Sequence, residues 1–174
     1  MMSVEQQVLQ VRDKLTPEVM SALSGKDRGE VSRLLLSLET SVRRERAAGS
    51  FVTFAEEVWP PFIEGYHHTK MAEAFERVAS GDLKRLMINM PPRMGKSQLT
   101  SWLLPAWIMG KYPDKKIIMA SHTAELAVRF GRMVRNLINS DEYKELFPGV
   151  LLTADSKAAG RFDVSGGGVY FSVG

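Results

Sequence analysis

The chain has 174 residues and a net charge of +3. Its length and its hydrophobic content of 44% are sufficient for a domain with a hydrophobic core. It has no cysteine, which excludes disulfides and thiolate metal sites and fits a reducing compartment. The most apolar run, residues 102–109, is interrupted by Pro105 and is too short to cross a bilayer, so we expect no membrane partner.

Residues 1–50 are predicted to form an all-helical segment. Thr16 and Pro17 have the form of an N-cap followed by proline at the first helical position. Asp27 is the predicted cap of a longer helix over 28–48, which Gly49 ends. The apolar stripes of the two parts are Val4, Val8, Val11 and Leu15, then Val31, Leu34, Leu35, Leu38 and Val42. This segment either packs on the rest of the chain or forms an arm that binds a partner or DNA.

Two further helices are predicted between residues 51 and 83. The first is short, covers residues 54–59 and ends at Pro60 and Pro61, because a residue before proline disfavours the helical conformation. The second is amphipathic, covers residues 66–79 and is stopped by Gly81.

The pattern changes after residue 84 to that of an α/β fold. Residues 86–88 and 117–120 are unbroken apolar runs, which is typical of strands covered on both faces of a parallel sheet. A helix over 96–109 lies between them, kinked by Pro105 and ended by Gly110, so the three elements form a βαβ unit. The remaining elements are expected to be helices over 123–138 and 141–147, a loop over 150–161, a turn at 166–168 and a strand from 169.

The turn between the first strand and its helix has the form of a phosphate-binding loop. Gly95, Lys96 and Ser97 are the core of the P-loop pattern. The glycine lets the backbone N–H groups approach a phosphate, and the positive end of the helix adds to the field. The lysine ammonium bridges β- and γ-phosphates, and the serine hydroxyl is a ligand for Mg²⁺. We therefore expect ATP, or a closely related triphosphate, and Mg²⁺ as the ligands.

Two features depart from the usual P-loop. Met90 stands where the full pattern has glycine, and Pro91 and Pro92 preset the backbone instead. Arg93 lies inside the loop, where its guanidinium either reaches the γ-phosphate as an arginine finger or forms a salt bridge that shapes the loop. The candidate catalytic residues are thus Lys96 and Arg93, and the candidate nucleotide contacts run over the loop residues Pro92, Arg93, Met94, Gly95, Lys96, Ser97 and Gln98.

Residues 87–97, Met-Ile-Asn-Met-Pro-Pro-Arg-Met-Gly-Lys-Ser, resemble the deviant Walker A motif of the large terminase subunit of tailed bacteriophages and prophages. That family commonly lacks the first glycine and often has Pro-Pro and an arginine there. Residues 120–127, 130–132 and 161–163 are also similar to the family, and the resemblance extends from about Phe51 to the end. Residues 1–50 carry no such resemblance.

The resemblance implies a P-loop NTPase fold of the RecA/ASCE type, with flanking helices and an incomplete parallel sheet over residues 51–174. It implies an ATPase in a motor that translocates double-stranded DNA into procapsids. The partners would be a terminase small subunit and a portal protein, in a homo-oligomeric ring in the bacterial host cytoplasm. The family's Walker B strand and nuclease domain are expected beyond Gly174, so we expect this chain alone to bind ATP without useful hydrolysis.

In the family, a segment upstream of the Walker A motif contacts adenine. Tyr66, His67 and His68 lie in the comparable place here. The resemblance makes Tyr66 and His67 candidates for stacking on the base. The alternative is that the histidines are surface residues beside a half-buried tyrosine.

The helix predicted over 123–138 has one basic side. Its apolar residues are Leu126, Phe130, Met133, Val134 and Leu137, and opposite them lie Arg129, Arg132 and Arg135. Such a stripe suits contacts with the phosphate backbone of DNA, which give affinity without reading sequence. The alternative is a solvated helix face.

Two other functions fit the same residues. One is a different P-loop ATPase, such as a helicase. The other is a nucleotide-binding module without hydrolysis, whose N-terminal helices dock a partner subunit.

Overall fold

The computed structural model describes residues 4–174, so Met1 to Ser3 of the predicted helical segment lie outside the described residues. The chain divides into two compact units, one ending at Arg46 and one covering Ala47–Gly174. No helix in the described range is both long and apolar enough to span a bilayer.

The first unit is helical, as predicted, with α1 (Val4–Lys14), α2 (Pro17–Ala22) and most of α3 (Gly25–Gly49). The predicted cap Thr16 is confirmed, because its hydroxyl accepts the N–H of Val19 at 3.3 Å. The predicted cap of α3 is wrong. Ser24 accepts the N–H of Asp27 at 3.2 Å and donates to the Asp27 carboxylate at 2.7 Å, so the helix begins at Gly25 and Asp27 lies in its first turn.

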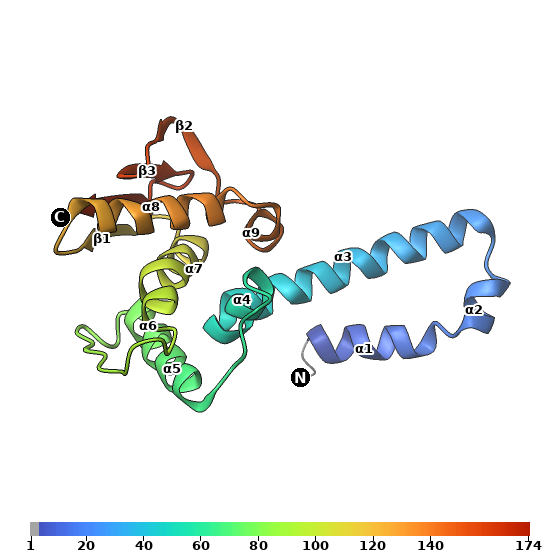
Figure 1. Cartoon of the computed structure of the whole chain (residues 1–174). Coiled ribbons are helices and arrows are strands. Elements are labelled where there is room, and N and C mark those ends of the chain that lie inside the picture. The colour runs from blue at the N-terminus through green and yellow to red at the C-terminus, as the bar shows by residue number, and fades with distance from the viewer. Residues whose placement is uncertain (1–3) are drawn as a thin grey trace. The chain divides into compact units, whose positions relative to one another are not determined.

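Helices α1 and α3 run side by side in opposite directions within this unit (Figure 1). An ion pair joins Arg12 to Glu39 at 3.9 Å. Val8 is buried, but Leu34 and Leu38 of the predicted apolar stripe are 59% and 40% exposed. The predicted stripe is too wide, since one neighbouring helix covers only a narrow part of the α3 surface.

The second unit begins with α4 (Phe51–Val58) and α5 (Tyr66–Ser80). Ser50 caps α4 by accepting the N–H of Thr53 at 3.3 Å, so this helix starts earlier than predicted. Gly81 ends α5 in the left-handed conformation, with φ of +89°, as predicted.

The helix after the loop over residues 90–95 consists of three consecutive parts: α6 (Lys96–Gln98), a π-helical segment η1 (Leu99–Leu103) and α7 (Leu104–Lys111). The N–H of Leu104 donates to the Leu99 carbonyl, five residues back. This wider turn lies directly before Pro105, whose missing N–H and ring would disrupt a regular α-helix here. Gly110 does not end the helix. A Cβ there would lie 2.6 Å from the Phe147 ring, so this glycine allows close packing.

The sheet has four strands, β1 (Lys116–Ala120), β2 (Leu152–Lys157), β3 (Arg161–Val164) and β4 (Val169–Val173), in the order β1-β4-β3-β2. Only β1 and β4 are parallel. The predicted turn at residues 166–168 and the following strand are confirmed. The prediction of a loop over 150–161 is wrong, because β2 forms there.

The prediction of a strand over 86–88 is also wrong. No described strand pairs with these residues, and Met87 is 84% exposed. A strand needs a hydrogen-bonded neighbour, which an apolar run cannot supply by itself. The predicted βαβ unit is therefore absent from the described structure, and assignment to the P-loop fold stays a prediction.

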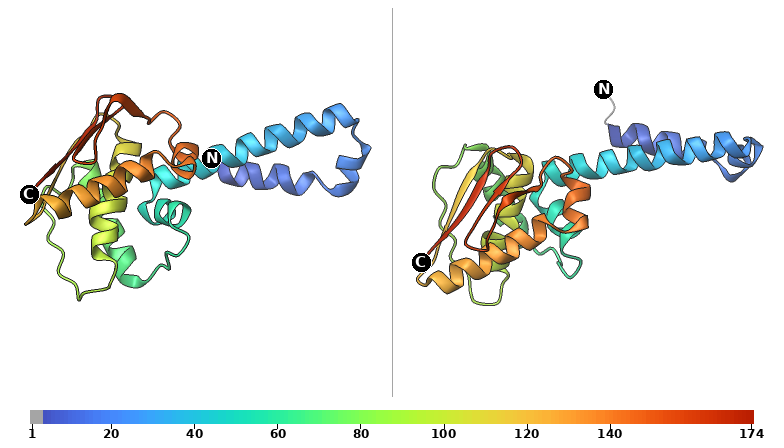
Figure 2. Two further views of the ribbon diagram at one scale, coloured as in Figure 1. Left: turned by 45° about the horizontal axis from the view of Figure 1, so that its top comes forward. Right: turned by 90° about the horizontal axis from the view of Figure 1, so that it is seen from above.

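Helix α8 (Ala124–Ile138) lies along one face of the sheet, followed by the short α9 (Asp141–Leu146) (Figure 2). Helix α8 approaches the sheet closely at Gly131, where a Cβ would lie 2.7 Å from the hydroxyl of Ser172 in β4. The other face is open. Ile118 is 71% exposed and Phe171 is 43% exposed, so the prediction that the strand at 117–120 is covered on both faces is wrong.

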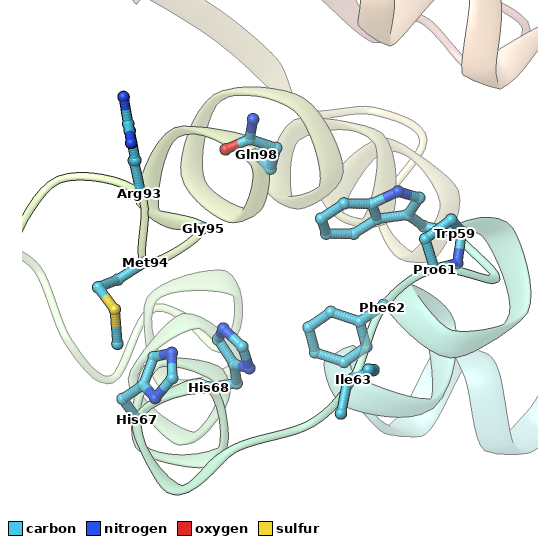
Figure 3. Close-up of a pocket in the computed structure, with 10 residues that line it drawn as sticks. All are labelled: Trp59, Pro61, Phe62, Ile63, His67, His68, Arg93, Met94, Gly95 and Gln98. Carbon is cyan, nitrogen blue, oxygen red and sulfur yellow. The ribbon is translucent and has the colours of Figure 1, made fainter.

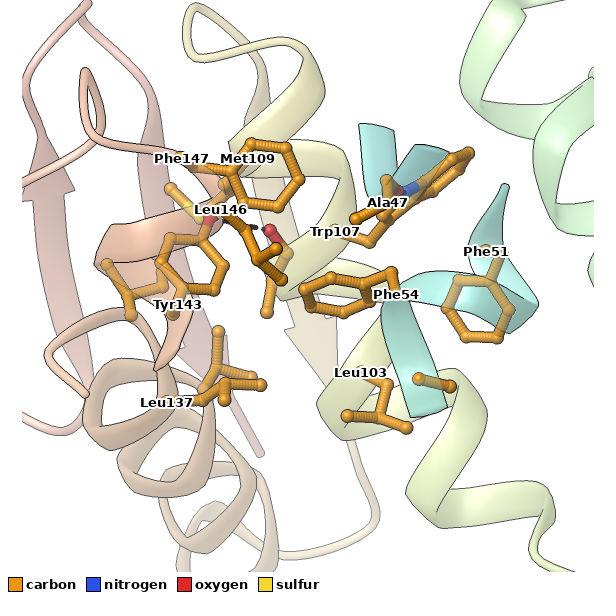
Figure 4. Packing of buried hydrophobic residues seen from close by; sticks show 14 of the residues in the cluster. Ala47, Phe51, Phe54, Leu103, Trp107, Met109, Leu137, Tyr143, Leu146 and Phe147 are labelled. Carbon is orange, nitrogen blue, oxygen red and sulfur yellow. Dashed lines mark hydrogen bonds between the residues drawn. The ribbon is translucent and has the colours of Figure 1, made fainter. Parts of the chain in front are cut away.

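The hydrophobic core lies among α4, α7, α8 and α9 and contains most of the aromatic side chains (Figure 4). The ring of Phe54 packs edge-on against Tyr143, with centroids 6.2 Å apart. Two buried polar groups are satisfied within it. The Trp107 indole donates to the Ala47 carbonyl at 2.9 Å, and the Tyr143 hydroxyl donates to the Ala106 carbonyl at 2.8 Å. These contacts fix the helix that follows the loop over residues 90–95.

Candidate functional site

The loop before α6 has an unusual backbone conformation. Arg93 has φ of +67° and Gly95 has φ of +76°, and both lie in the left-handed region. The N–H of Leu99 donates to the Gly95 carbonyl at 3.0 Å, so the helix begins directly after the glycine. Alternation of left-handed and other residues turns successive N–H groups towards one side, which is how backbone nests bind anions. The loop is therefore built like an anion-binding turn at the start of a helix.

A cavity of about 550 Å³ opens beside this loop. Figure 3 shows its lining, which comes from the loop, from the start of α5 and from the turn after α4: Trp59, Pro61, Phe62, Ile63, His67, His68, Arg93, Met94, Gly95 and Gln98. A space of this size is within the range of small-ligand sites. The wall opposite the loop is mostly aromatic and aliphatic, and the polar groups are few.

Five of the predicted nucleotide contacts line the cavity, namely Arg93, Met94, Gly95, Gln98 and His67. Four others do not: Pro92, Lys96, Ser97 and Tyr66. Tyr66 is 80% exposed rather than half-buried. Lys96 and Ser97 lie in the first turn of the helix behind the loop, where Lys96 is half-buried and Ser97 is exposed. The structure thus places the loop at the cavity but leaves Tyr66 outside it.

The aromatic wall is not predicted from the sequence. The Trp59 and Phe62 rings lie 5.8 Å apart, and Trp59 packs edge-on against Trp102 of the π-helical segment at 5.7 Å. Pro60 and Pro61 predict only a helix end, although they bend the chain so that aromatic residues on either side meet. A proline pair flanked by aromatic residues is the signal that could have found this wall.

His68 is a half-buried polar side chain of this cavity. Its Nδ1 accepts the N–H of Gly65 at 3.1 Å, and its ring centroid lies 5.0 Å from Phe62 and 3.8 Å from His67. Burial, followed by the neighbouring His67, lowers the pKa of His68, while backbone groups of Ile63 and Met94 and the Glu64 carboxylate partly offset this. The neutral imidazole is therefore favoured.

Arg93 extends from the loop away from the two histidines (Figure 3). A non-glycine residue in the left-handed region costs roughly 1–2 kcal/mol. Such strain persists only where the surroundings fix the backbone. Arg93 is held in this way because it lies between the pair Pro91 and Pro92 and the start of the helix. No salt bridge of Arg93 is found among the described residues, so the alternative role of shaping the loop through an ion pair has no support here.

No cluster of three or more metal-ligating side chains occurs in the described part of the chain. Mg²⁺ bound with ATP does not need one, because it takes most of its ligands from phosphates and water and one or two from the protein. The Ser97 hydroxyl, in the first helical turn and exposed, is a suitable single oxygen ligand. The donor set thus fits Mg²⁺ held by nucleotide rather than by the protein alone.

The basic side of α8 is partly as predicted. Arg129 and Arg132 are exposed, whereas Arg135 is half-buried and donates to the Asn136 side chain at 3.0 Å. Arg135 also lines a separate cavity of about 280 Å³ with Asn136, Asn139 and Leu152. On the opposite side, Val134 and Leu137 are buried and the other predicted apolar residues are half-buried. Only two of the three arginines are therefore fully presented at the surface.

Comparison of the chain with models of protein families, with curated proteins and with solved structures found no match.

Proposed function

We propose that this chain binds the phosphates of Mg²⁺-ATP through residues 90–97 and holds the adenosine part in the adjoining cavity. The observation that carries the proposal is the loop itself. Two left-handed residues, Arg93 and Gly95, precede the helix that begins at Lys96, and the loop borders a cavity of about 550 Å³. Backbone nests and helix N-termini of this kind bind phosphate groups.

Each side chain has a distinct role in this proposal. Lys96 contributes a cation to the β- and γ-phosphates, and Ser97 contributes an oxygen to Mg²⁺. Arg93 contacts the terminal phosphate from the outer side of the loop. The rings of Phe62 and His67 enclose the base, which binds by stacking and apolar contact rather than by many hydrogen bonds.

We assign binding rather than turnover to these residues. No carboxylate is among the residues that line the cavity, and ATP hydrolysis needs a group that orients the attacking water and completes the Mg²⁺ shell. The wider proposal, an ATP-driven motor that packages double-stranded DNA, is supported by the resemblance of residues 87–97 and 120–127 to large terminase subunits. In that proposal the exposed Arg129 and Arg132 contact the DNA backbone.

Titration calorimetry of the chain with ATP, with and without Mg²⁺, tests the binding proposal. Lys96→Ala removes a charge-assisted contact worth roughly 1.5–3 kcal/mol, so we expect the Kd to rise about tenfold to a hundredfold. Lys26→Ala, an exposed lysine in the other unit, is the control with the same change of charge and should leave the Kd unchanged. Equal affinity of the Lys96→Ala variant and the unsubstituted chain would contradict the proposal.

A further inference from the structure

His68 connects two parts of the candidate site that are distant in sequence. It occupies the first turn of α5, and its ring lies between the turn that precedes this helix and the phosphate loop. On one side, Nδ1 accepts the Gly65 N–H at 3.1 Å. On the other, a Cβ on Gly95 would lie 3.4 Å from Nε2, so this nitrogen lies directly against the loop. Figure 3 shows the ring facing the cavity between Phe62 and the loop.

The hydrogen bond at Nδ1 determines the state of the other nitrogen. A ring nitrogen that accepts a hydrogen bond carries no proton, so the proton of the neutral ring is on Nε2. This Nε2–H faces the loop, and the Met94 backbone raises the pKa of His68, as expected of a group that interacts with a ring proton. The two nitrogens therefore have opposite tasks: one caps the first turn of α5, and the other presents a donor to the loop.

We propose that His68 is a positioning residue that holds the loop over residues 90–97 in its binding conformation. The proposal rests on the proposed function, because it assigns a positioning residue to the same site. The loop contains two left-handed residues, and a strained backbone of this kind persists only where neighbouring groups fix it. The His68 ring lies beside Gly95 of this loop.

Three charged or titratable residues lie near His68. His67 lies beside it on α5, Glu64 lies in the preceding turn, and Arg93 lies on the loop. The Glu64 carboxylate accepts a hydrogen bond from the Thr69 hydroxyl at 2.7 Å, which keeps it at the start of the helix.

Two variants of the full chain separate the two nitrogens. In His68→Asn the amide oxygen takes the place of Nδ1, so the cap is retained and the loop contact is lost. In His68→Gln the terminal NH₂ reaches the place of Nε2, so the donor to the loop is retained. His122→Asn, the same change at an exposed histidine outside the cavity, is the matched control.

Two readouts are needed: amide hydrogen exchange of residues 93–97 without nucleotide, and the Kd for Mg²⁺-ATP at pH 7.5. For His68→Asn we expect loop exchange and the Kd to rise about three- to tenfold, the effect of one hydrogen bond. His68→Gln should stay within about twofold of the unsubstituted chain.

Unchanged loop exchange in His68→Asn would overturn the proposal, whatever the affinity for ATP. Equal loss of affinity in both variants would also overturn it, because it would indicate a merely structural histidine. If loop exchange responds as expected and the unsubstituted chain does not bind ATP, the proposed function fails and the positioning of the loop by His68 stands.

Discussion

Two residues of the loop proposed to bind phosphates, Arg93 and Gly95, differ in how well their backbone conformation could be predicted from the sequence. Gly95 is predicted to allow close approach of the backbone, and its φ of +76° agrees with a position that glycine tolerates best. Arg93 is predicted to act only through its charge, yet it has φ of +67°. A left-handed arginine is imposed by surrounding structure and leaves no signal in the residue type.

Gly95→Ala is the direct test of this conformation. A Cβ in the left-handed region costs roughly 1–2 kcal/mol, so we expect the free energy of unfolding to fall by about that amount and ATP binding to weaken. Gly149→Ala is the matched control, because Gly149 has no positive φ and a Cβ there would meet nothing within 4 Å. Urea titration of the two variants measures the difference, and equal stability would contradict the strained loop.

The structural roles of two glycines within helices could not be predicted from the sequence. Gly110 has the form of a helix end in the sequence, and Gly131 is marked there only by the family resemblance. Both instead allow another element to approach closely, Phe147 in the first case and Ser172 in the second. The sequence cannot distinguish these roles, because the neighbouring group lies far along the chain in both cases.

Some helix ends follow from local caps and others do not: Thr16 and Gly81 are as predicted, whereas Asp27 and Gly110 are not. Thr123 accepts the N–H of Leu126 at 3.3 Å and begins α8, as expected from a local cap. Strand formation depends on a distant partner, so the apolar run at 86–88 does not form a strand whereas the polar residues of β2 do. The π-helical segment before Pro105 is also not predicted, since a proline can be accommodated by a kink or by a wider turn.

The basic side of α8 makes a prediction about DNA binding. Each neutralised phosphate contributes about 0.9 to the slope of log K against log salt on duplex DNA. If Arg129 and Arg132 both contact phosphates, replacing both by alanine should lower this slope by about 1.8. Fluorescence anisotropy with a duplex oligonucleotide at several salt concentrations measures it.

The paired substitution of Lys26 and Arg33, exposed cations of the other unit, is the control for net charge. An α8 variant with the same slope as this control would remove the arginines from the proposed DNA contact.

At the scale of the whole molecule, the sheet of the second unit is covered on one side only. The two neighbouring isoleucines of β1 point to opposite faces: Ile117 packs against the core, whereas Ile118 is 71% exposed. We expect Ile117→Ala to lower the free energy of unfolding by about 1–3 kcal/mol and Ile118→Ala to change it by less than about 0.5 kcal/mol.

The intrinsic strand preference is the same for both isoleucine substitutions, so it cancels in the comparison. Urea titration at one protein concentration is the measurement. Similar losses at both positions would indicate that the open face is covered in solution.

The central claim, that residues 90–97 bind nucleotide phosphates, is tested most directly by mapping where Mg²⁺-ATP acts on the isotopically labelled chain. We predict that the largest amide chemical-shift changes fall on residues 93–98 and on His67 and His68, and that Lys96→Ala reduces them at equal ATP concentration. Shift changes confined to other parts of the chain, or changes at the loop that Lys96→Ala leaves untouched, would contradict the assignment of this loop as the phosphate site.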